Sequence, residues 1–376
     1  MKRLFVAGGG TGGHLVPGLA LAERAIERFP GLRVTFFRTS RPIEARVFAG
    51  AHVEIEAREL DLSPPGRSLP SWVRFIRACH SAQALVREEI RRDRPDALVA
   101  LGGYPSLPGI IAALRERVPL VLLEQNCVPG RVVRLLWQRA ALLSCPAQAL
   151  SKLPGAGRGR PLVAATGVPL RSAVVKAAAE RRLSPAAPPE ALRTVLVVGG
   201  SQGARGLNRA IREALPALAK FRNRISWIHV AGDADKEDMA EAYRKGGWES
   251  RVLGYAPDLP ALLARADLVI ARSGGTTVSE LTAIGVPAAL VPYPHHRDRH
   301  QLLNALPLVE AGAARLIHEE KLGPESMTRL FEEVLFDPAR LRAMEAAARA
   351  LGSLEATDGV LDLILRVVGR YEQVGR

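Results

Sequence analysis

Near its start the chain reads LFVAGGGTGGHLVPG over residues 4–18. The apolar run before Gly8 predicts a buried strand that the glycines end. Four apolar residues then recur at the spacing of one helix face: Leu15, Leu19, Ala22 and Ile26. Pro17 suits the first turn of that helix. Residues 8–14 are therefore expected to form a strand–glycine–helix loop, where backbone N–H groups and a helix dipole converge on an anion.

Two further apolar runs end in glycine turns. Residues 97–101 lead into Gly102-Gly103-Tyr104, and residues 194–198 lead into the segment from Gly199 to Ala204. One glycine loop is weak evidence, because many are plain tight turns. Three in one chain favour a ligand with more than one phosphate cluster, or two phosphorylated ligands.

Size and composition bound the class of protein. A chain of 376 residues with 48% apolar content has enough material for two domains, each with its own core. No run approaches the ~18 apolar residues of a spanning helix and no signal segment opens the chain, so we expect a soluble, cytoplasmic protein. Cys79, Cys127 and Cys145 lack zinc-ligand spacing, which disfavours disulfides and a structural metal.

The net charge of +14 suits nucleic acid, an anionic membrane or polyanionic small ligands. The sequence has no nucleic-acid module, and aromatics make up only 5% of it, which disfavours single-strand stacking. Two stretches interleave apolar residues with arginines: residues 69–77, with Trp72, Phe75 and Ile76, and residues 131–139, with Trp137. Each is either an ordinary core helix or part of a membrane-contact face.

Both halves of the chain alternate strand and helix patterns, which predicts two doubly wound parallel sheets. The strand patterns cover residues 33–37, 52–56, 118–123, 225–230, 252–254, 268–270 and 288–291. Arginines follow residues 33–37, at the place where a dinucleotide-binding unit carries an acidic residue. Binding of NAD is therefore disfavoured, and binding of NADP remains a weak alternative. A composition shift places the domain boundary near Gly167.

Polar residues follow several of these strands. Glu124-Gln125-Asn126 stands at a carboxyl end, where ligands bind in open sheets, although Asn126 fits a helix cap equally well. Asp233 and Asp235 resemble the metal-holding carboxylates of many sugar transferases. A capped helix over residues 236–245, with Asp235 as N-cap, is the favoured interpretation because it needs no metal.

The turn Ser273-Gly274-Gly275 is the fourth glycine exit. Glu280 follows one turn into the next helix and suits a vicinal diol, with a surface glutamate as the alternative. Residues 292–304 contain histidines whose spacing does not match the ligands of a closed zinc site. A polar loop that holds a sugar through Gln301 and Asn304 is therefore the favoured interpretation.

Seven motifs in order closely resemble the MurG family of peptidoglycan N-acetylglucosaminyltransferases. They are residues 8–14, Gly102-Gly103-Tyr104 with Pro108-Gly109, residues 124–126, 167–171, 199–204, 273–280 and 292–304. Leu123 stands where the family often has histidine, and Ile110 where glycine is common. The resemblance implies a GT-B fold, an α/β architecture of two Rossmann-like lobes facing across a cleft. Residues 1–166 would form the acceptor and membrane lobe, residues 167–349 the donor lobe, and helix 350–376 would pack back on the first lobe.

The resemblance also implies an inverting transferase that needs no cofactor and no metal. It would move N-acetylglucosamine from UDP-N-acetylglucosamine to the muramyl 4-hydroxyl of lipid I, the lipid-linked muramyl-pentapeptide, and yield lipid II. The protein would be peripheral, on the cytoplasmic side of the plasma (inner) membrane. It would take part in cell-wall synthesis and so in cell shape and cell division. Other cell-wall enzymes are candidate partners, and nucleic acid is not.

The implied site residues fall into four groups. Donor-binding residues are Thr11, Gly12, Gly13, Asn126, Arg171, Ser201, Ala256, Gly275, Thr276, Thr277, Val278, Ser279, Glu280 and Gln301. Gly10, Gly102, Gly103 and Tyr104 form the acceptor-pyrophosphate loops. Trp72, Phe75, Ile76 and Trp137 form the membrane contact. His14, at the edge of the first loop, is the candidate catalytic base.

Three alternatives remain open on the sequence. Another GT-B transferase, such as a diacylglycerol glycosyltransferase, shares the donor lobe. A UDP-N-acetylglucosamine epimerase would convert the donor without an acceptor. A non-catalytic sensor would bind the nucleotide sugar and never release UDP.

Overall fold

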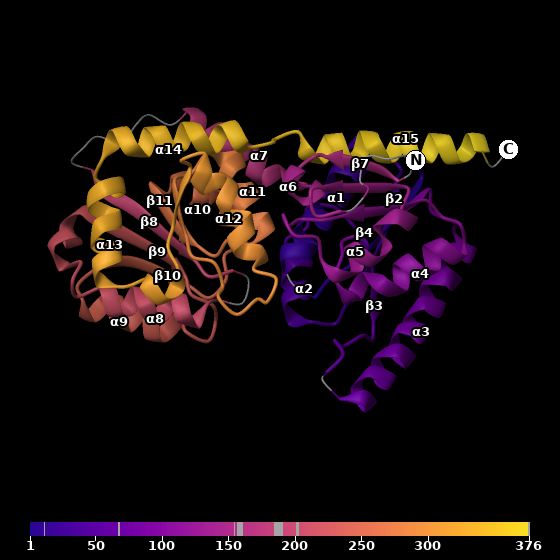
Figure 1. The fold of residues 1–376 in the computed structure, drawn as a ribbon, viewed down its shortest axis with the longest axis horizontal. Coiled ribbons are helices and arrows are strands. Elements are labelled where there is room, and N and C mark those ends of the chain that lie inside the picture. Colours follow the sequence, from indigo (N-terminus) through magenta and orange to yellow (C-terminus); the bar gives the residue numbers. More distant parts are fainter. Residues whose placement is uncertain are drawn as a thin grey trace. The chain divides into compact units, whose positions relative to one another are not determined.

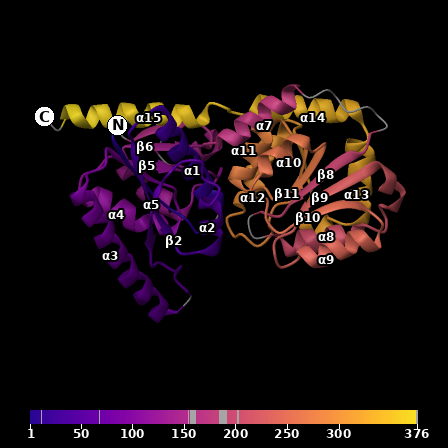
Figure 2. The same ribbon diagram turned by 180° about the vertical axis from the view of Figure 1, so that it is seen from behind.

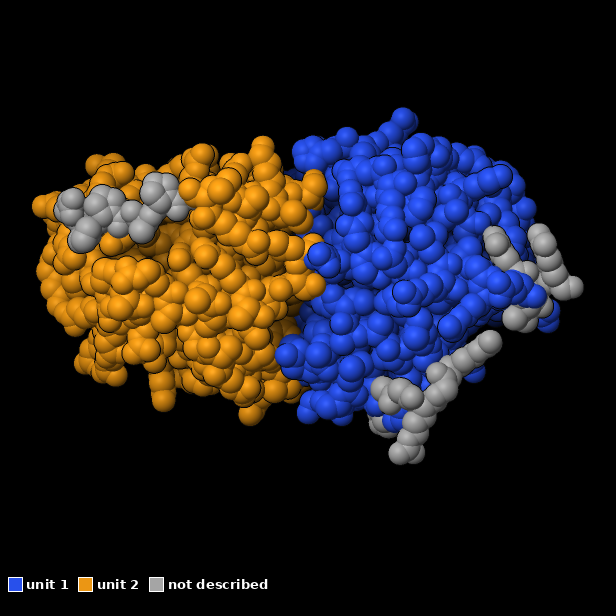
Figure 3. Space-filling model, turned by 90° about the horizontal axis from the view of Figure 1, so that it is seen from above, with its two compact units in different colours: residues 1–171, 355–376 blue, residues 172–354 orange. Residues whose placement is uncertain are grey.

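Buried apolar runs form the strands of two parallel sheets, one in each of two units (Figures 1 and 2). The structure is a computed structural model and describes residues 1–10, 12–66, 68–153, 155, 161–183, 191–200 and 203–374. Unit 1 comprises Met1–Arg171 and Glu355–Arg376, and unit 2 comprises Ser172–Leu354, coloured separately in Figure 3.

Sheet A, in unit 1, has the order β3-β2-β1-β4-β5-β6-β7 over the described residues. Its strands are β1 Arg3–Ala7, β2 Arg33–Thr39, β3 Glu56–Leu60, β4 Ala97–Ala100, β5 Leu120–Leu123, β6 Leu142–Cys145 and β7 Leu162–Ala165. All pairs are parallel. The order reverses between β1 and β4, which is the switch point of a doubly wound sheet.

Helices cover both faces of sheet A, as the alternation of β1 requires. Leu4 and Val6 lie in one core cluster with apolar residues of α1, α2 and α15. Phe5 and Ala7 lie in the other, with residues of α3 to α6. The helices are α1 Gly12–Arg28, α2 Pro42–Phe48, α3 Leu69–Arg92, α4 Leu107–Arg115, α5 Arg131–Leu136, α6 Ala147–Leu150 and α15 Ala356–Val374, with short 3₁₀ turns η1 Tyr104–Ser106 and η2 Trp137–Arg139.

Sheet B, in unit 2, has the order β10-β9-β8-β11-β12-β13, again parallel. Its strands are β8 Arg193–Val198, β9 Ile225–Val230, β10 Glu249–Leu253, β11 Leu268–Ala271, β12 Ala288–Leu290 and β13 Ala314–Leu316. The helices are α7 Ser172–Leu183, α8 Arg205–Ala214, α9 Lys236–Lys245, α10 Leu259–Arg265, α11 Gly275–Ile284, α12 His300–Glu310, α13 Pro324–Leu330 and α14 Pro338–Leu351, with the short turns η3 Ala219–Arg224, η4 Glu319–Lys321 and η5 Phe331–Leu335. Helices α8, α9 and α13 lie on one face of the sheet and α7, α10 and α11 on the other (Figures 1 and 2).

Two local expectations are wrong. The strand expected at residues 52–56 lies at Glu56–Leu60, where the residues pair in register with Thr35–Thr39 of β2. Glu56 Oε2 also accepts from Arg3 Nη2 at 3.0 Å and from Thr35 Oγ1 at 2.8 Å. Helix α1 begins at Gly12, so Pro17 lies inside the helix rather than in its first turn. A proline there removes one N–H donor, a cost that the packing of α1 outweighs.

Helix α1 packs unusually close to the end of β4. A Cβ at Gly18 would lie 2.4 Å from Leu101 Cδ1, and a Cβ at Gly8 would lie 2.6 Å from Leu101 Cβ. Since real Cβ contacts are essentially never this short, a side chain at either position would have to displace Leu101. Glycine therefore lets α1, at Gly18, and the end of β1, at Gly8, lie against Leu101. The approach brings the first turn of α1 to the Leu101 carbonyl.

A buried polar network joins α8, β9 and α9 in unit 2. Asn208 Oδ1 pairs with His229 Nε2 at 3.0 Å, and Tyr243 donates its hydroxyl to His229 Nδ1 at 3.0 Å. Asn208 Nδ2 donates to Asp235 Oδ2 at 2.7 Å. Helix α9 starts after Asp235 as expected, but the side chain of Asp235 makes no capping hydrogen bond. Burial lowers the pKa of His229 to about 3, so the imidazole is neutral.

This burial makes unit 2 less stable in acid. The unfolded chain binds a proton at His229 below pH 6.5 and the folded chain does not, so the free energy of unfolding should fall by about 2 kcal/mol from pH 6.5 to 5. His229→Gln should remove this slope, although it weakens the network. Urea unfolding read by hydrogen exchange in β9 measures it, with exposed His295→Gln as control. Equal slopes in wild type and His229→Gln would contradict the assignment.

Candidate functional site

Most of the candidate turns follow strands at the two switch points. Residues 8–14 follow β1 and residues 101–104 follow β4, which are neighbours in sheet A. Residues 199–204 follow β8 and residues 272–275 follow β11, which are neighbours in sheet B. In open α/β sheets ligands bind outside these carboxyl ends. Thr11 and Ser201, both expected donor contacts, lie outside the described residues.

His14 is half-buried in the first turn of α1, and its ring is held by two acceptors. Nδ1 lies 3.0 Å from the Leu101 carbonyl oxygen and 2.8 Å from Gln125 Oε1. Because a carbonyl oxygen only accepts, Nδ1 carries a proton, and in the neutral imidazole the lone pair is then on Nε2. A Cβ at Gly103 would lie 4.0 Å from Nε2, so the basic nitrogen faces the Gly102-Gly103 turn.

A buried carboxylate that the sequence analysis missed holds the first glycine loop. Glu44, fully buried in α2, accepts from Gly10 N at 2.6 Å and from Thr39 N at 2.8 Å. Thr39 Oγ1 also donates to Glu44. Glu44 therefore occupies the Gly10 amide and fixes the backbone of the loop at that residue. A lone acidic residue in a short helix reads as a surface group, so no pattern identified it.

The guanidinium group of Arg41 lies beside the same loop. Arg41 donates from Nη1 to the Gly10 carbonyl at 2.7 Å, and its guanidinium carbon lies 5.9 Å from the centre of the Tyr104 ring. The Tyr104 hydroxyl is a buried atom without a hydrogen-bond partner among the described residues. Gly10, Arg41 and Tyr104 thus meet at the carboxyl edge of sheet A, where an arginine suits a phosphate.

Glu124 organises the turn after β5. It is 4% exposed, and its Oε1 accepts from the backbone N of Gln125 and of Asn126, each at 2.9 Å, while Oε2 accepts from Gly130 N at 2.7 Å. Asn126 Nδ2 also donates to Glu124, at 3.1 Å. The structure thus gives Asn126 a contact within its own turn.

In unit 2 the candidate residues gather around the start of α11. Gly275, Thr276, Thr277, Val278, Ser279 and Glu280 all lie in its first two turns. Ser279 Oγ donates to Gly275 O at 2.9 Å, and Glu280 is 4% exposed rather than a surface group.

Helix α12 ties the strand ends together. Asn304 Nδ2 donates to the Ser273 carbonyl at 3.0 Å, and Gln301 Oε1 accepts from Tyr293 N at 2.9 Å. The fully buried Ser273 Oγ has no hydrogen-bond partner among the described residues. A buried hydroxyl of this kind is expected to meet a ligand or water.

Arg171 and Ala256 stand apart from these turns in the sequence. Arg171 is the half-buried residue that precedes α7, and its charge lowers the pKa of Glu23, although burial raises that pKa overall. Ala256 is buried in the turn between β10 and α10.

The expected membrane-contact residues divide by burial. Trp72 and Ile76 are 48% and 62% exposed on α3, together with Leu69 at 82%. Phe75 and Trp137 are 8% and 5% exposed and belong to the core of unit 1, so the expectation of surface contact is wrong for these two. Helical periodicity explains the division, because Phe75 shares its face with buried Ala82 and Val86.

Phe75 instead links the exposed surface to the site. Its ring lies 6.0 Å from that of Trp72 and 6.2 Å from that of Tyr104. We call Leu69, Trp72, Val73 and Ile76 the α3 patch, and Arg74 and Arg77 lie beside it.

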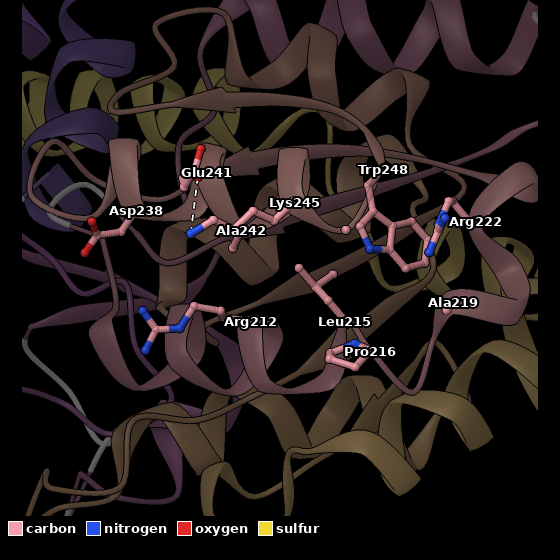
Figure 4. Close-up of a pocket in the computed structure, with 11 residues that line it drawn as sticks. Arg212, Leu215, Pro216, Ala219, Arg222, Asp238, Glu241, Ala242, Lys245 and Trp248 are labelled. Atoms are coloured by element: carbon pink, nitrogen blue, oxygen red, sulfur yellow. Dashed lines mark ion pairs between the residues drawn. The ribbon is translucent and has the colours of Figure 1, made fainter.

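A separate groove of about 630 Å³ lies between α8 and α9 (Figure 4). Arg222 and Trp248 stand at one end of it and Arg212 and Asp238 at the other (Figure 4). None of its lining residues belongs to the candidate turns. Among the described residues no group of three or more His, Cys, Asp or Glu could hold a metal ion, and no helix is long and apolar enough to cross a membrane.

Glu44→Gln tests the internal support of the glycine loop. The amide group must face a backbone N–H with an N–H of its own, so we expect a loss of ~1–3 kcal/mol in the free energy of unfolding and a raised KM for a ligand of this loop. Chemical denaturation and initial rates measure both. Exposed Glu54→Gln is the control, and wild-type values for Glu44→Gln would refute the role.

Known proteins match this arrangement over the whole chain. Residues 4–142 match the glycosyltransferase family 28 N-terminal domain, and residues 194–360 match the C-terminal domain. The UDP-N-acetylglucosamine--N-acetylmuramyl-(pentapeptide) pyrophosphoryl-undecaprenol N-acetylglucosamine transferase of Anaeromyxobacter dehalogenans is 38% identical, over 98% of this chain and 94% of that protein.

Two solved structures bear on the fold. The crystal structure of Acinetobacter baumannii MurG is similar with a TM-score of 0.72 and 27% identity, over 97% of this chain and 100% of that one. A UDP-N-acetylglucosamine 2-epimerase has a TM-score of 0.70 but only 16% identity, over 98% and 96% of the two chains, so it shares the fold alone. The GT-B fold and the resemblance inferred from the seven motifs are confirmed, and the chain belongs to glycosyltransferase family 28.

Proposed function

We propose that this protein transfers N-acetylglucosamine from UDP-N-acetylglucosamine to the muramyl 4-hydroxyl of lipid I, the step in peptidoglycan synthesis that yields lipid II. Relatives with this activity in their names support the reaction. The observation that carries the mechanism is the pair of acceptors on His14 Nδ1, which leaves Nε2 as a base at the carboxyl edge of sheet A.

His14 acts as the general base in this proposal. The acceptor hydroxyl oxygen bonds to the anomeric carbon and its proton moves to Nε2. The bond from that carbon to the diphosphate oxygen breaks, and its electron pair leaves with UDP. Attack from the face opposite the leaving group inverts the configuration. The positive charge that develops on the imidazole of His14 is stabilised by the two oxygens that accept from Nδ1, those of the Leu101 carbonyl and of Gln125 Oε1.

We assign donor binding chiefly to unit 2. The amino end of α11 offers backbone N–H groups and a helix dipole to the diphosphate, and Glu280 accepts from the ribose hydroxyls. Ser273 Oγ and Gln301 supply neutral polar contacts beside that helix. Arg171, Ser201 and Ala256, with Thr11, Gly12, Gly13 and Asn126 of unit 1, complete the proposed donor set. Arginine and amide donors neutralise the diphosphate without a metal.

Unit 1 carries the acceptor and the membrane surface in this proposal. The loop at Gly10, the Gly102–Tyr104 turn and Arg41 hold the acceptor's diphosphate, with Gly10 contributing its place in the loop and not its N–H group, which Glu44 occupies. The rings of Trp72, Phe75 and Tyr104 run from the α3 patch to that edge, which suits a substrate with a lipid tail and a charged head. An apolar patch with flanking arginines favours peripheral binding to the anionic inner leaflet of the plasma membrane. Other cell-wall enzymes are further proposed partners.

UDP release from labelled donor, with and without lipid I, tests the reaction. We expect release only with lipid I, whereas an epimerase would convert the donor alone and a sensor would release nothing.

His14→Ala tests the base. We expect kcat to fall by ~10²–10⁴ because general-base help is lost, while the KM for the donor changes little. Initial rates with a water-soluble acceptor analogue measure both. His80→Ala, exposed on α3, is the control. Turnover near that of the wild type would remove His14 from the chemistry.

Replacing Leu69, Trp72 and Ile76 by serine tests the α3 patch. We expect co-sedimentation with anionic phospholipid vesicles to fall at least ~10-fold, because apolar area and its insertion are lost, and activity on the water-soluble analogue to persist. Leu183→Ser, 86% exposed at the end of α7, is the matched control. Equal losses in both assays would indicate a structural role for the patch.

A further inference from the structure

Gln125 makes the shortest hydrogen bond recorded for the His14 ring, at 2.8 Å to Nδ1. It is 4% exposed and follows β5, while His14 lies in α1, so two distant segments of unit 1 meet here. A buried amide beside a candidate base has either a packing role or a role through that base.

The orientation of the Gln125 amide is fixed by its own surroundings. Nε2 lies 3.4 Å from the carbonyl oxygens of Leu101 and Leu123, which only accept. The NH₂ group therefore faces these carbonyls, and Oε1 faces His14. The backbone of Gln125 is held in turn, because its N donates to the buried Glu124. The amide cannot turn over without leaving buried groups unsatisfied.

Oε1 therefore demands a proton on Nδ1 of His14. The Leu101 carbonyl makes the same demand at 3.0 Å, but a single backbone acceptor leaves the ring free to tilt about that bond. Two acceptors from different strands fix both the tautomer and the ring plane, as the orienting group of a catalytic histidine does elsewhere.

The side chain of Gln125 is a neutral amide, and this neutrality matters for the charge of the His14 ring. A carboxylate in this place would stabilise the imidazolium strongly and keep the ring protonated to higher pH. A neutral carbonyl orients the ring without placing a negative charge beside it.

We propose that Gln125 is the positioning residue for His14: it holds the ring in the Nδ1–H form, with Nε2 directed at the acceptor hydroxyl, and its neutrality sets the pH range of the base. This inference rests on the proposed role of His14 as the base.

The tautomer is measured first, by ¹H–¹⁵N correlation of ¹⁵N-histidine-labelled full-length protein, with His14→Ala identifying the signal. We expect the Nδ1–H form in the wild type. In Gln125→Met, which keeps the shape but not the acceptor, we expect a larger fraction of the Nε2–H form, because the Leu101 carbonyl alone then favours Nδ1–H. A wild-type ring in the Nε2–H form, or an unchanged Nδ1–H signal in Gln125→Met, would overturn the proposal. This readout needs no substrate, so it stands whether or not His14→Ala lowers kcat.

Kinetics with the water-soluble acceptor then test the consequence. Gln125→Met should lower kcat by ~10–100-fold with the donor KM unchanged. Gln125→Glu keeps an acceptor and should restore much of kcat at high pH, with the acidic limb of the kcat profile moved up by on the order of one pH unit. Gln83→Met removes another buried amide of unit 1, which accepts from Arg115, and should leave the profile unchanged. A Gln125→Glu profile that coincides with that of the wild type would contradict the role of neutrality.

Discussion

The contact of α1 with Leu101 is the constraint on which the acceptor side of this molecule depends. Without a side chain at Gly18 the helix lies against Leu101 at the end of β4, and Gly8 lets the end of β1 do the same, at the switch point of sheet A. This close packing places the first turn of α1 beside the backbone carbonyl of Leu101. The imidazole of His14 is thereby held by the sheet itself, and a bulkier residue at either glycine would move the ring away from both its acceptors.

Buried carboxylates give the loops around this contact their shape. Glu44 gathers the amides of Gly10 and Thr39, and Glu124 gathers those of Gln125, Asn126 and Gly130. Each carboxylate is satisfied by several backbone donors, which compensates for its burial. The backbone of both loops is therefore fixed by internal hydrogen bonds, and a loop that is already ordered costs less free energy to order on binding.

The sequence predicts a helix or strand well where a local pattern of residues defines it. It predicts poorly the features that depend on contacts between residues far apart in the chain. The strand–glycine–helix units follow from an apolar run that meets glycines, and α9 from its own start signals. The strand at residues 56–60 was misplaced because the alternation of residues 53–58 does not show where pairing with Thr35–Thr39 of β2 begins. Phe75 could have been separated from Trp72 by helical spacing alone. Glu44, Arg41 and the acceptor role of Gln125 have no such signal, because each depends on a residue about 30 to 110 positions away.

Helix α15 closes the core of unit 1 only after unit 2 has been made. Val360, Leu361 and Ile364 are fully buried against residues of α1 and sheet A, yet they follow the whole of unit 2 in the chain. At ribosomal speeds of 5–20 residues per second, the intervening ~200 residues take about 10–40 s to synthesise. During that time the nascent first unit presents an uncovered apolar groove, a natural site for chaperone capture on the ribosome.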